Sequence, residues 1–92
     1  MKRVSVEVGD IVYCVDKYDN VWQCEVLEVK IEGRWFQYCL TANIAGHKID
    51  RNGKLAKESR VFHSVLADNL LVTLDEAYKV RDRLIEHKKD EY

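Results

Sequence analysis

The strongest constraint on the fold of this chain is the alternation of apolar and polar residues in residues 6–31, which is the pattern of a β-hairpin. Gly9 and Asp10 favour a turn ahead of it, because glycine adopts backbone angles that other residues avoid and aspartate hydrogen-bonds within turns. We therefore expect a strand over about 11–16, a polar turn and a second strand over about 21–31.

The second strand changes its apolar phase near Leu27. Before that point the inward set is Trp22, Cys24 and Val26, and after it the apolar residues are Val29 and Ile31. A shift of one residue within a strand predicts a β-bulge, which bends and twists the strand. Such a bend is what a small barrel needs in order to close.

The three cysteines, Cys14, Cys24 and Cys39, are an odd number and exclude a complete set of intramolecular disulfides. We interpret them as buried thiols. If residues 18–20 form a three-residue loop, Cys14 lies opposite Cys24 and both point into the core, so a Cys14–Cys24 bridge is the alternative. No two cysteines have the close spacing of a metal site.

After the first hairpin, the alternation of apolar and polar residues predicts a strand over about 35–41. Residues 42–59 are less regular, and we expect them to form an inserted loop in which Asn52-Gly53 indicates a type I′ turn. A further strand is expected over about 60–65, with Val61, His63 and Val65 on one face and Phe62 on the other.

A helix is predicted over about 74–88, because Thr73 and Glu76 form a capping box at its start. Its apolar face combines residues at three- and four-residue spacing: Leu74, Ala77, Tyr78, Arg81, Leu84 and Ile85. This narrow face indicates packing on the side of the barrel, or on a partner.

The composition fits one small domain over residues 1–92, since 47% of the residues are hydrophobic and the formal net charge is -1. No apolar run is long enough to span a membrane, and the N-terminus lacks the pattern of a signal peptide. We expect a cytoplasmic protein that does not contact membranes and exists as a monomer or a dimer.

The sequence offers no glycine-rich phosphate loop, no nucleophile elbow and no paired metal-ligand spacing. We therefore expect a non-catalytic chain without a cofactor. Two groups of residues are candidates for binding. The aromatic candidates are Tyr18 and Trp35, and the basic candidates, within residues 47–60, are Lys48, Arg51, Lys54, Lys57 and Arg60. Basic and aromatic side chains together can contact nucleic acid, which is one hypothesis for the partner.

Three segments carry a resemblance to a known class of proteins: VEVGDIVYCVD at 6–16, VWQCEVLEVKI at 21–31 and RWFQYCL at 34–40. They resemble small Src-homology-3-like barrels of the Tudor and KOW type. The closing residues 69–84, with Thr73, Glu76 and Ala77, are similar to the end of small uncharacterised proteins of phages and mobile elements of Firmicutes. This resemblance implies no catalytic residues.

The resulting prediction is a mainly β fold, a small Src-homology-3-like antiparallel β-barrel over about 4–66 with an inserted loop over about 42–59 and one C-terminal α-helix. The resemblance implies a non-catalytic binding module of a phage or mobile element that binds a host protein and inhibits a host enzyme or defence system. The alternative hypothesis is local nucleic-acid binding through the basic loop 47–60 and aromatics at the barrel rim.

Overall fold

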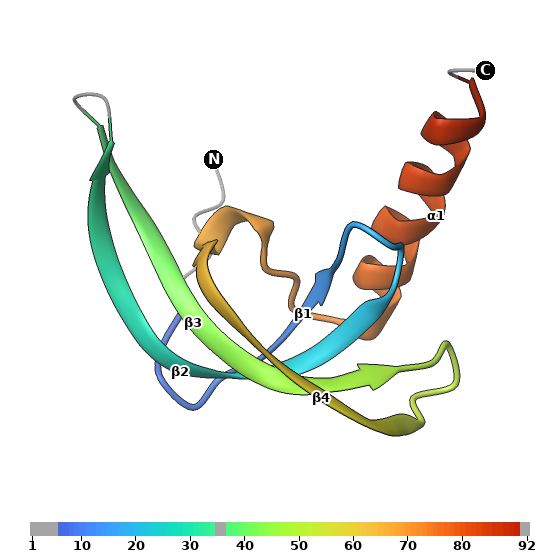
Figure 1. The fold of residues 1–92 in the computed structure, drawn as a ribbon, viewed down its shortest axis with the longest axis horizontal. Coiled ribbons are helices and arrows are strands. Elements are labelled where there is room, and N and C mark those ends of the chain that lie inside the picture. Colours follow the sequence, from blue (N-terminus) through green and yellow to red (C-terminus); the bar gives the residue numbers. More distant parts are fainter. Residues whose placement is uncertain (1–5, 35–36, 91–92) are drawn as a thin grey trace.

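A single curved antiparallel sheet and a C-terminal helix make up the computed structural model, which describes residues 6–34 and 37–90 (Figure 1). The sheet order is β1-β2-β3-β4, so each strand pairs with its neighbour in sequence. The elements are β1 (Ile11–Val15), β2 (Val21–Arg34), β3 (Gln37–Ile49), β4 (Leu55–Leu66), the 3-10 turn η1 (Ala67–Asn69) and α1 (Leu74–Asp90). The prediction of a mainly β fold with one C-terminal helix is confirmed.

The turn between β1 and β2 is built around Asp16. Its backbone N–H donates to the carbonyl of Asn20 at 2.9 Å, and its carboxylate accepts the backbone N–H groups of Tyr18 and Asn20, both at 2.9 Å. Asp19 adopts a φ of 65°, which aspartate tolerates better than most residues. Asp16 and Asn20 thus close a loop of residues 17–19, one position earlier than the loop of residues 18–20 considered above.

This turn sets the register of the first hairpin, in which Cys14 pairs with Trp22 and Val12 pairs with Cys24. The conditional expectation of Cys14 directly opposite Cys24 is therefore wrong. Both thiols are nevertheless buried and free, as the interpretation of the cysteines required, while Cys39 is half-buried and free.

The inserted loop expected over 42–59 is wrong, because these residues continue the sheet. β3 runs on to Ile49 and β4 already begins at Leu55. The turn between them repeats the first one: Asp50 N–H donates to the carbonyl of Lys54 at 3.0 Å, and its carboxylate accepts the N–H groups of Asn52 and Lys54. Of the Asn52-Gly53 pair only Gly53 has a positive φ, 88°, so the turn is not type I′.

Small residues explain why β3 lacks a clear strand pattern. Gly46 lies opposite Cys24, and a Cβ atom on it would overlap the backbone carbonyl of Gln23. Glycine here permits a close approach of β3 to β2. Because glycine has no side chain, this position contributes nothing to the apolar–polar alternation by which a strand is predicted. The strand character of this segment therefore comes from its neighbour rather than from its own side chains.

The main core lies on one face of the sheet and includes Trp22, Cys24, Val26 and Ile44, all at most 2% exposed. The expected bulge is confirmed, since the register between β2 and β3 shifts between Val26 and Glu28. Val29 packs against this core. Ile31, two residues later, is 73% exposed, because this end of β2 extends beyond the core.

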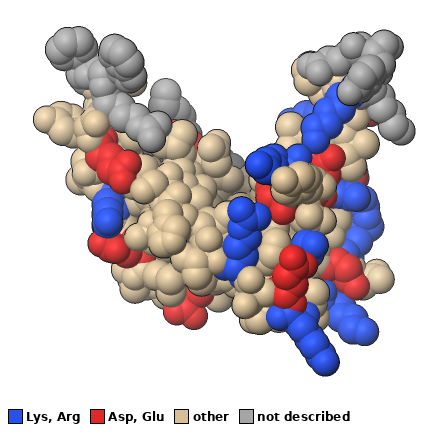
Figure 2. Space-filling view, in the orientation of Figure 1, with Lys and Arg blue, Asp and Glu red and all other residues tan. Residues whose placement is uncertain are grey.

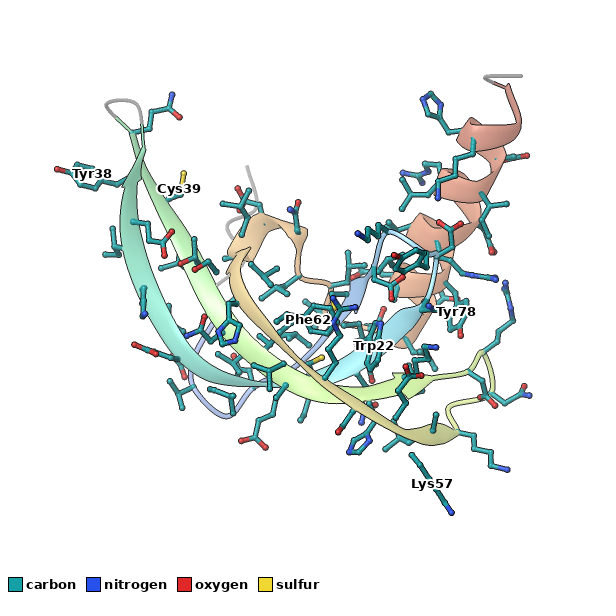
Figure 3. All side chains as sticks on the ribbon, in the orientation of Figure 1. Trp22, Tyr38, Cys39, Lys57, Phe62 and Tyr78 are labelled. Carbon is teal, nitrogen blue, oxygen red and sulfur yellow. The ribbon has the colours of Figure 1, made fainter. Side chains whose placement is uncertain are left out.

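Val61 and Phe62 lie on opposite faces of β4 as predicted, but the prediction that Val65 shares the face of Val61 is wrong. Phe62 packs against the main core with its ring centroid 5.5 Å from that of Trp22, whereas Val61 is 49% exposed. A second bulge, with Ser64 at a φ of 52°, lets Val65 join Phe62 on the core side. Figure 3 shows Trp22 and Phe62 together inside the curve of the sheet.

The chain then passes around the outer edge of β1. Ala67 and Leu70 complete the main core, and Leu71 exchanges two backbone hydrogen bonds with Tyr13, each 2.8 Å. Beyond Leu71 the helix packs on the opposite face of the sheet, where Ala77 meets Val21 and Ile49 in a second small core. The helix therefore packs within its own chain rather than on a partner.

The helix begins as predicted, because the Thr73 hydroxyl accepts the backbone N–H of Glu76 at 3.2 Å. It continues to Asp90, two residues past the expected end. Nowhere in 6–34 and 37–90 is a helix long and apolar enough to cross a membrane. The strand pairings of the same residues join neighbouring strands only and do not show the sheet closed into a barrel.

Candidate binding cleft

A cleft of about 490 Å³ lies where the two aspartate turns meet α1. The β1–β2 turn contributes Asp19 and Asn20, and the helix contributes Tyr78 and Arg81. The β3–β4 turn contributes Asp50, Arg51 and Lys54. Residues from three separate segments of the chain thus surround one space. We call it the turn–helix cleft.

The floor of the turn–helix cleft is apolar. Val21 and Ile49, which are 3% and 6% exposed, belong to the second core, and Leu55 and Tyr78 line the same space. The Tyr78 hydroxyl donates to the carbonyl of Ile49 at 2.7 Å, so the phenol ring is held against the end of β3. An apolar group could bury surface here without displacing a polar contact.

Four cations stand around this floor: Lys48, Arg51, Lys54 and Arg81. Arg51 forms a hydrogen-bonded ion pair with Asp82 at 2.9 Å, and its guanidinium carbon lies 4.7 Å from the centre of the Tyr78 ring. Lys48 pairs with Glu58 at 2.8 Å. The cleft therefore has positive groups in fixed positions, supported from both the sheet and the helix.

The Arg51–Asp82 contact also alters the ionisation of both partners. The hydrogen bond from Arg51 is the largest influence on Asp82 and holds the pKa of that carboxyl below its usual value. The same contact raises the pKa of Arg51. Both groups are exposed, so the pair positions the guanidinium without adding much stability.

Arg81 is fixed by the first turn, because its Nε donates to the carbonyl of Asp19 at 3.0 Å. The two carboxylates of the cleft are already engaged elsewhere. Lys88 contacts both oxygens of Asp19, at 3.0 and 3.1 Å, and Asp50 accepts the backbone of its own turn. Lys54 has no ion pair within the part of the chain that the structure describes. The charge left to a ligand is therefore positive.

The charged residues are also unevenly distributed along the chain. Figure 2 shows Lys and Arg over α1 and the β3–β4 turn, with Asp and Glu among them. Residues 47–63 carry five Lys and Arg against two Asp and Glu, whereas residues 74–90 carry five of each. The excess of positive charge beside the cleft therefore comes from the β3–β4 segment, to which an anionic partner would be attracted.

The structure brings three of the seven predicted site residues together, namely Lys48, Arg51 and Lys54. Lys57 is exposed on β4 and points away from the cleft (Figure 3). Arg60 lies over the ring of Phe62, 4.9 Å from its centre. Tyr18 is 68% exposed at the first turn with Lys17 over its ring, and Trp35 lies outside the described residues.

Sequence reasoning missed the contributions of Arg81, Tyr78 and Leu55 to the cleft. The sequence analysis assigned Arg81 and Tyr78 to the packed face of the helix. This is correct for Tyr78, which packs against the second core. Arg81 is half-buried and also lines the cleft. A cation on an otherwise apolar helix face was the available signal, because it needs a nearby carbonyl or carboxylate. Here that partner is the carbonyl of Asp19.

A second cavity, of about 560 Å³, lies at the far end of the β2–β3 hairpin and is lined by Ile31, Tyr38, Cys39 and Leu40 together with residues of η1. Within 6–34 and 37–90 there is no group of three or more His, Cys, Asp or Glu placed to hold a metal ion. Comparison with known proteins found no matching family model, no matching curated protein and no matching solved structure.

Proposed function

We propose that this chain is a non-catalytic binding module for another protein, and that the turn–helix cleft takes a segment in which acidic residues flank an apolar side chain. The observation that carries the proposal is an apolar floor of Val21, Ile49 and Tyr78 surrounded by positioned cations. An apolar side chain would contact the floor, and a carboxylate beside it would meet Lys54, which forms no ion pair with the described residues. Both parts of the recognition then come from rigid turns and a helix.

The geometry favours a protein segment over a nucleic acid. Binding along a phosphate backbone needs a row of cations free to neutralise it. The five cations of residues 47–60 do not form such a row, because Lys48 pairs with Glu58, Arg51 pairs with Asp82 and Arg60 covers Phe62. Nucleic-acid binding is therefore kept as the competing outcome of the experiment below.

Two finer parts of the proposal rest on the resemblance to small Src-homology-3-like barrels. One is that the curved sheet is such a barrel, and the pairing of Leu71 with the outer edge of β1 supports it by adding a fifth extended segment. The other is that the partner is a host protein whose enzyme or defence activity is inhibited on binding.

The test uses peptides that carry Asp or Glu on both sides of a Leu or Phe, with Asn and Gln versions of the same peptides as neutral probes. Fluorescence anisotropy should show binding of acidic peptides that weakens with salt. Lys54→Glu should reduce affinity by about tenfold or more, because like charges then face each other. Lys57→Glu makes the same charge change outside the cleft and should leave binding unchanged.

Equal loss in the two variants would overturn the cleft as the site. Absence of binding to every acidic peptide would overturn the proposed recognition. Binding of a single-stranded oligonucleotide in place of the peptides, lost equally in Lys54→Glu and Lys57→Glu, would replace the proposal with nucleic-acid binding through the basic segment.

A further inference from the structure

The far half of β2 has one unpaired edge. Val26 makes the last backbone contacts on the β1 side, donating to Asp10 at 2.9 Å and accepting from Gly9 at 2.8 Å. From residue 27 to 34 the strand pairs only with β3 as far as the described residues extend. Figure 1 shows this part of the β2–β3 hairpin projecting away from the rest of the sheet. An unpaired edge of this length is a template for another strand.

The same half of the hairpin carries exposed apolar side chains. Ile31 is 73% exposed and Tyr38 is 83% exposed, while Leu40, the register partner of Ile31, is 36% exposed. Tyr38 pairs with Gly33 across the two strands. Surface apolar groups collected at a free strand edge indicate a contact that the isolated chain does not make.

The bulge decides which backbone groups point out from this edge. Up to Val26 the even residues of β2 direct their N–H and C=O groups toward β1, as the Val26 contacts show. The extra residue at Leu27 shifts this phase by one. Beyond the bulge, Val29, Ile31 and Gly33 therefore present their backbone groups at the free edge.

The charges at the alternate positions Glu28, Lys30 and Glu32 alternate in sign. When a second copy of this strand runs antiparallel and Ile31 lies opposite Ile31, Lys30 of each copy lies opposite Glu32 of the other. Both of these charged pairs are then attractive. The backbone phase also fits, because Ile31 and the pair Val29–Gly33 are edge-facing positions in both copies.

The neighbouring registers that preserve the backbone phase are repulsive. Sliding one strand by two residues in one direction sets Lys30 opposite Lys30 and Glu28 opposite Glu32. Sliding it by two residues in the other direction sets Glu32 opposite Glu32. Like charges directly opposite each other destabilise strand pairing, so a single register is selected.

We propose that this chain forms a symmetric dimer in which residues 28–34 of β2 pair antiparallel with the same residues of a second copy, centred on Ile31. The dimer joins the two sheets into one and covers the exposed Ile31 side chains. The interface is of the isologous kind expected for a two-fold dimer. It lies at the end of the molecule away from the turn–helix cleft, so the proposal does not depend on the function of that cleft.

The contacts that these charges make within one chain are weak enough to be exchanged. Lys30 and Glu28 are 3.7 Å apart with about half of each side chain exposed, and Glu32 accepts a hydrogen bond from the Ser64 hydroxyl at 3.1 Å. Neither contact is buried. In the dimer, the carboxylate of Glu32 in the second copy lies directly opposite Lys30. Glu28, in contrast, is two positions away on the same strand as Lys30.

Analytical ultracentrifugation of the full chain is the test. The unaltered protein should sediment as a monomer–dimer equilibrium. Lys30→Glu and Glu32→Lys should each raise the dimer dissociation constant by about tenfold or more, because two attractive pairs become repulsive. Lys57→Glu alters the net charge by the same amount as Lys30→Glu, far from this edge, and should leave the equilibrium unchanged.

The decisive measurement mixes the two weakened variants. A chain with Lys30→Glu carries two acidic residues at positions 30 and 32, and a chain with Glu32→Lys carries two basic ones. The mixture should therefore dimerise more tightly than either variant alone. The double variant with both changes should dimerise by itself, since the charges are exchanged. A monomeric unaltered protein, or single variants that dimerise as well as it does, would overturn the proposal.

Discussion

At the scale of single residues, two aspartates determine the turns on which the rest of the molecule depends. Asp16 and Asp50 each accept two backbone N–H groups of their own turn, and in each turn a residue with positive φ, Asp19 or Gly53, closes the loop. Asp16 has a further role, because one of its oxygens accepts the Trp22 indole N–H at 2.9 Å. It thereby connects the turn to the main core.

The ionisation of Asp16 gives the first prediction. Burial tends to raise its pKa, but the hydrogen bonds from Trp22, Asn20 and Tyr18 outweigh burial and hold the pKa below its ordinary value. Ionised Asp16 therefore adds stability above about pH 4, the value in an unfolded chain, and this stability is lost as the pH falls through the lower folded pKa.

Asp16→Asn should lower the free energy of unfolding at neutral pH by about 1–3 kcal/mol. The amide of asparagine has one oxygen in place of two, and its NH₂ group cannot accept a hydrogen bond from the Trp22 indole N–H or from the backbone of the turn. It should also flatten the loss of stability in acid. Urea titrations at a series of pH values measure both effects. Asp68→Asn, on an exposed residue of η1, is the control and should change neither quantity.

The thiols give a second prediction at this scale. The hydrogen bond with Cys24, together with burial, raises the pKa of Cys14, whereas the same hydrogen bond lowers the pKa of Cys24. Both sulfurs are buried, so we expect both to react slowly in the folded protein. Cys39 is half-buried and lines the second cavity. In a maleimide time course followed by peptide mass spectrometry, Cys39 should be labelled first. Labelling of Cys14 or Cys24 at the same rate would contradict the burial of the pair.

At the scale of elements, the capped helix and the long β2–β3 hairpin are held by local features that single substitutions can remove. Thr73→Ala should lower the free energy of unfolding by about 1 kcal/mol, because the N–H of Glu76 loses its side-chain acceptor. Chemical denaturation measures the change. An unaltered midpoint would show that the cap does not stabilise the start of α1.

The close approach of β3 to β2 gives the prediction for the sheet. Gly46→Ala should lower the free energy of unfolding by about 1–3 kcal/mol, because its Cβ would overlap the carbonyl of Gln23 and push the strands apart. Gly33→Ala is the matched control on β2, where the nearest atom is a Tyr38 ring carbon at 3.5 Å. Thermal unfolding of the two variants should separate them clearly.

At the scale of the whole molecule, one sheet supports two cores on opposite faces. Trp22 and Leu70 lie in the main core, whereas Ala77 and Ile49 lie in the second core beneath α1. Both cores use β1 and β2, with Cys14 facing one way and Val15 the other. Loss of packing on one face of the sheet should therefore also destabilise the core on the other face.

This sharing of strands predicts a single unfolding transition. Leu70→Ala should lower the free energy of unfolding by about 2–5 kcal/mol, because Leu70 is 2% exposed. In a Trp35→Phe background, fluorescence of Trp22 reports on the main core and circular dichroism at helical wavelengths reports on α1. Both probes should shift together. A helix signal that keeps its original midpoint would show that the two cores unfold separately.

The sequence by itself determined the features whose signals are local. The alternation in residues 11–31, the phase shift at Leu27, the burial of Cys14 and Cys24 and the capped start of the helix all follow from residues close together in the chain, and the structure agrees with each. The burial predicted for Cys39 is only partial. Three of the seven predicted site residues also meet in the turn–helix cleft, because Lys48 at the end of β3 is close in sequence to Arg51 and Lys54 in the turn that follows.

Only the tertiary structure decided the features that depend on neighbours far away in sequence. Residues 42–59 belong to the sheet because β2 pairs with small residues such as Gly46, which show no strand pattern of their own. Phe62 faces the core because of its pairing with Ile44. The cleft exists because Arg81 reaches the turn at Asp19, 62 residues earlier in the chain, and no local pattern encodes that contact.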